Sequence, residues 1–91
     1  MTEKDLIEIL DDCNDGLCEL EQMIQLYNEH KDLSCRAKAS VRIDIFITMI
    51  TDRFMLTKEL LGGVGSDGFL DMMKVYDGQL NALKNFWKRV K

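Results

Sequence analysis

Large apolar residues recur near both ends of the chain at alternating intervals of four and three positions. This spacing places the residues on one side of an α-helix, whereas a half-buried β-strand repeats every two residues. The pattern therefore predicts two amphipathic helices with heptad seams, over residues 3–29 and 67–90. The first seam is Leu6, Leu10, Cys13, Leu17, Leu20, Ile24 and Tyr27, and the second is Phe69, Met73, Tyr76, Leu80, Leu83, Trp87 and Val90.

A third helix is predicted between these two, over residues 33–61. This helix is bounded by two segments that are rich in helix-breaking residues. The first is "NEHKDLS" at 28–34, where Asp32 or Ser34 can cap a helix, and the second is the glycine-rich "GGVGSDG" at 62–68. The chain contains no proline to interrupt a long helix. Since short connections make neighbouring helices antiparallel, we expect residues 1–91 to form one all-α domain, an up-down-up antiparallel three-helix bundle.

The middle helix is apolar over more of its circumference than such a bundle requires. On a helical wheel its large apolar residues form two clusters that together cover roughly 200°, about twice the stripe of a one-sided helix. Either the other two helices dock on different sides of it, or part of its surface meets another copy of the protein. The clusters are Ile45, Met49, Leu56 and Leu60, and then Ile43, Phe46, Ile47, Ile50, Phe54 and Leu61.

Apolar residues beside the seams of the first and last helices favour self-association. Ile9 and Met23 flank the first seam, and Met72, Val75, Ala82 and Phe86 flank the last. We therefore expect an interaction surface on this apolar flank, used by a partner protein and by a second copy. The predicted partner-binding residues are Phe54, Met55, Met72, Val75 and Phe86.

Arg42 and Arg53 lie on one line of the middle helix, between its two apolar clusters. If the chain turns near residue 31, a residue of the first helix lies opposite a residue of the middle helix when their numbers sum to about 62. The arginines would then pack their stems and reach carboxylates on the first helix. The alternative is that they set the register or line a site for an anionic ligand. The predicted structural ion pairs join Arg42 and Arg53 to Glu8, Asp12 and Glu19.

The net charge of −4 disfavours binding to nucleic acid or to an anionic membrane. The expected topology nevertheless collects most of the cations at one end of the bundle. They either form a solvated end that matches the helix dipole or hold the phosphates of a nucleotide or another anionic small molecule. The residues of this alternative anion site are Lys31, Arg36, Lys38, Arg42 and Lys88.

Catalytic and metal-binding patterns are weak in this sequence. His30 has no cysteine or carboxylate at a ligand spacing, and the odd count of three cysteines fits a reducing cytoplasm. No apolar run approaches the roughly 18 residues that span a bilayer. Acidic residues at three- and four-residue spacing on the first helix suggest a magnesium-dependent nucleotide hydrolase as a third hypothesis, but the middle helix lacks matching pairs of carboxylates.

The sequence carries no motif that we can match to a known family. We expect a cytoplasmic, non-enzymatic protein-binding module of the adaptor, chaperone or inhibitor type, without a metal, a cofactor or catalytic residues. It would self-associate through its apolar helical flank, and its partner would be another protein rather than a nucleic acid or a membrane.

Overall fold

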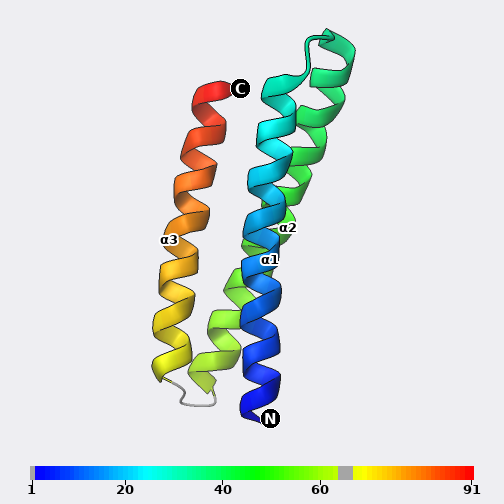
Figure 1. Ribbon diagram of the computed structural model, residues 1–91. Helices are drawn as coiled ribbons and strands as arrows, with labels where there is room; N and C mark the ends of the chain where they lie inside the picture. Colours follow the sequence, from blue (N-terminus) through cyan, green and yellow to red (C-terminus); the bar gives the residue numbers. More distant parts are fainter. Residues whose placement is uncertain (1, 64–66) are drawn as a thin grey trace.

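The computed structural model describes residues 2–63 and 67–91, and these residues form three α-helices and no strand. The helices are α1 (Glu3–Glu29), α2 (Leu33–Gly63) and α3 (Asp67–Val90), and each packs against the other two. The C-terminus lies at the same end of the bundle as the α1–α2 connection, and the N-terminus lies at the opposite end (Figure 1). The predicted all-α up-down-up bundle is confirmed, with α2 two residues longer than expected. Residues 64–66 of the glycine-rich segment lie outside the described part.

Polar side chains cap the N-termini of the first two helices. The hydroxyl of Thr2 accepts a hydrogen bond from the Asp5 amide, and the Asp5 carboxylate accepts one from the Thr2 amide, which completes a capping box. At the start of α2 the carboxylate of Asp32 accepts hydrogen bonds from the amides of Ser34 and Cys35, at 2.7 and 3.2 Å. Of the two candidate caps for α2, Asp32 is therefore the one used.

The heptad seams form the core between the three helices. All seven predicted seam residues of α1 are buried, and α3 buries Met73, Leu80 and Trp87 from its own seam. The rings of Tyr27 and Trp87 meet edge to face, with centroids 4.7 Å apart. From α2 the core receives Ile43, Ile50, Phe54, Thr57 and Leu61.

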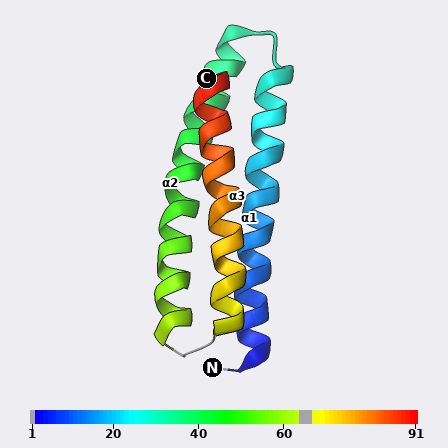
Figure 2. The same ribbon diagram turned by 90° about the vertical axis from the view of Figure 1, so that its left-hand side faces the viewer.

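Helices α1 and α2 approach closely at Gly16. A Cβ atom at this position would lie only 2.9 Å from Cδ1 of Ile50, so the absence of a side chain allows the contact. The residue numbers of Gly16 and Ile50 sum to 66, whereas a tight turn at residue 31 predicts a sum of about 62. Helix α2 is therefore shifted along α1 by about four residues, or one helical turn, from the expected register. The cause is that α2 begins beyond the end of α1, as both views of the ribbon show (Figures 1 and 2).

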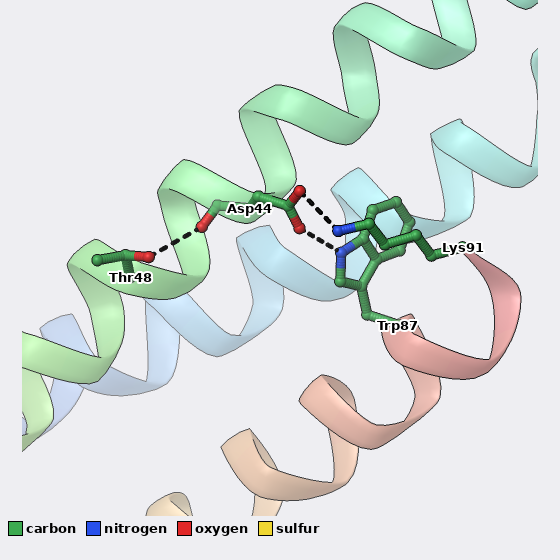
Figure 3. Close-up of polar contacts among 4 residues, drawn as sticks. All are labelled: Asp44, Thr48, Trp87 and Lys91. Atoms are coloured by element: carbon green, nitrogen blue, oxygen red, sulfur yellow. Dashed lines mark hydrogen bonds and ion pairs between the residues drawn. The ribbon is translucent and has the colours of Figure 1, made fainter.

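Polar contacts join α2 to α3 on the far side of the core from α1. Nζ of Lys58 lies 3.2 Å from the Asp77 carboxylate. Nearer the C-terminus, the Asp44 carboxylate accepts hydrogen bonds of 2.8 Å from the indole N–H of Trp87 and from Nζ of Lys91 (Figure 3). Helix α3 thus runs alongside α1 and α2 on one side of that pair and packs against both (Figure 2).

Candidate functional site

A line of large apolar side chains is exposed along the outer side of α2. Its members are spaced by four and seven residues, so they share one side of the helix. Their exposed fractions range from 37% to 67%, although Ile43 and Ile50 of the same helix are almost fully buried on its other side. We call this line the outer stripe; it consists of Val41, Ile45, Met49, Leu56 and Leu60.

The outer stripe borders a surface hollow between α1 and α2 with a volume of about 540 Å³. Ile9 and Cys13 of α1 contribute apolar surface opposite the stripe residues Met49, Leu56 and Leu60. Charged residues stand in the same hollow, which we call the acidic hollow: Asp12, Asp52 and Arg53. An apolar surface with a charged rim is typical of a protein interface.

Two further hollows continue along the α1–α2 boundary. The middle hollow shares Asp12, Met49 and Arg53 with the acidic hollow and adds Asp15 and Glu19. The third, which we call the basic hollow, lies at the α1–α2 connection and has a volume of about 280 Å³. Within the described part of the chain α3 lines none of the three, so together with the outer stripe they form one α1–α2 face, which is directed away from α3. The basic hollow is lined by Met23, Leu26, His30, Cys35, Lys38, Ala39, Arg42 and Ile43.

Charge is distributed unevenly along the α1–α2 face. Carboxylates from the middle of α1 and from the second half of α2 gather around the acidic and middle hollows, where Arg53 is the single cation among the lining residues. At the other end the basic hollow holds Lys38 and Arg42 beside His30, and no carboxylate is among its lining residues. The face therefore carries apolar side chains along its whole length, with negative charge toward one end and positive charge toward the other.

The predicted partner-binding residues do not form one surface. Phe54 is only 1% exposed and belongs to the core, which corrects its assignment to an exposed flank. Val75 and Phe86 are exposed and lie four residues from Gln79 and Ala82, which meet α1 in another hollow, so they occupy the α1–α3 side. Met72 is exposed on that side too. Met55 is exposed three turns from Asp44, on the side of α2 that meets α3.

The predicted ion pairs of Arg42 and Arg53 are not formed. Within residues 2–63 and 67–91, the ion pairs closer than 4.0 Å are Lys58–Asp77, Lys74–Asp71 and Lys91–Asp44. The one-turn shift in register explains the difference for Arg42, which lies beside Met23 and Leu26 instead of Glu19. Arg53 shares the acidic and middle hollows with Asp12 without pairing with it, and Glu8 lines neither hollow.

The five residues of the alternative anion site are also dispersed. The guanidinium of Arg36 lies over the Tyr27 ring, 4.8 Å from its centroid, and packs against the core. Lys88 lines a hollow with Asp44 and Trp87 between α2 and α3. Lys31 is exposed in the α1–α2 connection, so only Lys38 and Arg42 share a hollow.

Little in the described residues resembles a reaction centre. Burial raises the pKa of the Cys13 thiol, whose sulfur lies 3.9 Å from the Thr57 hydroxyl, and a raised pKa disfavours the thiolate form that a nucleophile needs. No group of three or more His, Cys, Asp or Glu side chains in the described ranges is placed to hold a metal ion. Over those same ranges, no helix combines the length and the apolar composition of a membrane-spanning segment. Comparison with protein-family models, curated proteins and solved structures found no match.

Sequence reasoning identified most of the outer stripe but did not select it as the binding surface. Ile45, Met49, Leu56 and Leu60 already formed one of the two wheel clusters of the middle helix. The other cluster aligns with the seams of the neighbouring helices and enters the core. The sequence alone does not show which of the two clusters enters the core, so the outer stripe could not be selected from it.

Proposed function

We propose that this chain is a non-enzymatic protein-binding module that self-associates, and that two copies pair through the outer stripe of α2. The observation that carries the proposal is the alignment of five large apolar side chains, each at least 37% exposed, on the side of α2 away from α3. Contiguous apolar surface of this kind on a small protein usually marks an interaction site.

A second copy suits this surface because of its charges. An unrelated partner would need its own apolar stripe with an opposed arrangement of charge, whereas a second copy already has both. Carboxylates surround the acidic hollow, and Lys38 and Arg42 stand at the basic hollow. A two-fold symmetric interface uses the same patch on both copies, so a patch with opposite charges at its ends is self-complementary.

The decisive test is the solution mass of the wild-type protein and of two single variants, measured by light scattering over a range of concentrations. We expect a wild-type dimer. Met49→Glu places a carboxylate at the middle of the outer stripe, beside the acidic hollow, and should raise the dissociation constant on the order of 100-fold, the effect of losing a central contact. Val75→Glu is the matched control, because Val75 is 60% exposed against 58% for Met49 but lies on the α1–α3 side.

A wild-type protein that stays monomeric at millimolar concentration would overturn the proposal. If Val75→Glu dissociates the dimer and Met49→Glu does not, the interface lies on the α1–α3 flank instead. Helical content measured by circular dichroism should be the same for all three proteins, because both substituted side chains are exposed.

A further inference from the structure

The charges of α2 itself follow the gradient of the α1–α2 face. Lys38 and Arg42 lie in its first half and are exposed beside the basic hollow. Asp52 lies in the second half at the acidic hollow, and exposed Glu59 follows seven residues later, two turns along the same side. The first half of the outer stripe lies beside Lys38 and Arg42, and the second half lies beside Asp52 and Glu59, so the two halves of the apolar line are flanked by opposite charges.

We infer that the two copies of the proposed dimer pair antiparallel, with Lys38 and Arg42 of each copy against Asp52 and Glu59 of the other. This inference rests on the proposed self-association and specifies its geometry. A two-fold axis close to Met49 would set Lys38 level with Glu59 of the second copy. With a rise of 1.5 Å per residue, it would place Arg42 about 5 Å along the axis from Asp52, within reach of a long side chain.

The antiparallel arrangement also brings positive charge toward the carboxylates of α1. Asp12, Asp15 and Glu19 line the middle and acidic hollows, and Arg53 offsets only part of their charge. An antiparallel second copy brings its own Arg42 close to the level of Asp12. A parallel pair would instead oppose cations with cations and carboxylates with carboxylates, and like charges brought together across an interface weaken it.

Charge reversal at both ends of α2 tests the orientation. The first double variant is Lys38→Glu with Arg42→Glu, and the second is Asp52→Lys with Glu59→Lys; all four side chains are exposed, so the fold is retained. In the antiparallel dimer each variant alone opposes like charges at both ends. We therefore expect the dissociation constant of each variant dimer to be higher than that of wild type by a factor on the order of 10 or more. Sedimentation velocity at low salt measures this change.

Mixing the two variants completes the test. An equimolar mixture should form a heterodimer about as tight as the wild-type dimer, because every reversed pair is again complementary. If both variants dimerise as tightly as wild type, or the mixture is much tighter than wild type, the antiparallel inference fails while self-association stands. If wild type and both variants are monomers, the proposed function itself fails, and with it the inference.

A cross-link gives a second measurement that does not depend on charge. In a Cys18→Ser, Cys35→Ser background, copies carrying Lys38→Cys and copies carrying Glu59→Cys should form a disulfide when mixed under mild oxidation. Copies carrying only Lys38→Cys should not cross-link to one another. Cross-linking of the Lys38→Cys copies alone would show a parallel pair and overturn the inference. Cys13 can stay in place because its side chain is only 1% exposed.

Discussion

The indole nitrogen of Trp87 lies 2.8 Å from Oδ1 of Asp44, and this hydrogen bond joins the last turns of α3 to the first half of α2. The indole is buried, whereas the carboxylate is partly exposed at the edge of the bundle. The second carboxylate oxygen accepts a hydrogen bond from Lys91, one turn after Trp87 (Figure 3). Asp44 thus supplies the acceptor that a buried indole N–H requires.

Replacing Asp44 by alanine should destabilise the fold by about 1–2 kcal/mol, because a buried N–H group loses its partner. Urea unfolding followed by circular dichroism measures the change, at one fixed protein concentration since dimerisation alters apparent stability. Asp11→Ala is the control, an exposed carboxylate on α1, and should change stability by about 0.5 kcal/mol or less. Equal effects of the two substitutions would contradict a structural role for Asp44.

The same contacts predict a dependence of stability on pH. The hydrogen bond from Lys91, and then that from Trp87, lower the pKa of the Asp44 carboxyl in the folded protein. Because the folded pKa lies below the unfolded one, the contribution is complete above about pH 5 and is lost as the pH falls through the folded value.

Asp44→Asn isolates the part of this pH dependence that comes from the charge, since the amide oxygen still accepts from Trp87. We expect its unfolding free energy to fall less steeply than that of wild type between pH 5 and pH 2. Lys91→Met should flatten the curve in the same way, because it removes the cation that lowers the pKa most. Parallel curves for wild type and both variants would show that Asp44 contributes nothing through its charge.

Cys13 and Cys18 should react at different rates with a thiol reagent, because only Cys13 is buried. Cys13 is buried with a raised pKa, whereas Cys18 is exposed on the surface of α1. In a chain that retains only Cys13, a thiol reagent at pH 8 should react many times more slowly than in a chain that retains only Cys18. Urea should remove the difference. Equal rates in the native proteins would mean that the core around Cys13 and Thr57 opens readily.

The helices and the core could be predicted because each depends on local spacing. The heptad seams fixed which side of α1 and α3 is buried, and the breaks at residues 28–34 and 62–68 fixed where the helices end. The register of α2 against α1 could not be predicted in this way. It depends on how far α2 extends past the end of α1, which a short connection does not determine, and the ion pairs assigned to Arg42 and Arg53 depended on it.

The candidate surface could be predicted only in part for a related reason. The wheel separated α2 into two apolar clusters, but it could not decide which of them meets α1 and α3. That decision depends on three-dimensional packing, in which Phe54 entered the core and Ile45 stayed outside. Asp44 was missed because its partners, Trp87 and Lys91, lie more than forty residues away in the sequence.

The close approach of α1 and α2 at Gly16 leads to a last prediction, made against a matched glycine. Gly78 lies in α3 with nothing within 4 Å of an added Cβ, so Gly78→Ala should stabilise the fold by about 1 kcal/mol through helix propensity alone. Gly16→Ala gains the same propensity but must displace Cδ1 of buried Ile50, 2.9 Å away. We expect this crowding to cost about 1–3 kcal/mol and to cancel or outweigh the gain.

The Ile50→Val background isolates the crowding at this contact. This substitution should itself cost about 0.5–1.5 kcal/mol, since it removes one buried methyl group. With Cδ1 gone, the nearest atom to the new Cβ is Cγ1 at 3.5 Å, an ordinary contact distance. Gly16→Ala should then stabilise the protein nearly as much as Gly78→Ala does, so the cycle of single and double variants should show a coupling on the order of 1 kcal/mol. Additive effects would mean that Ile50 yields to the new methyl group at no cost, and that glycine is not what permits this approach.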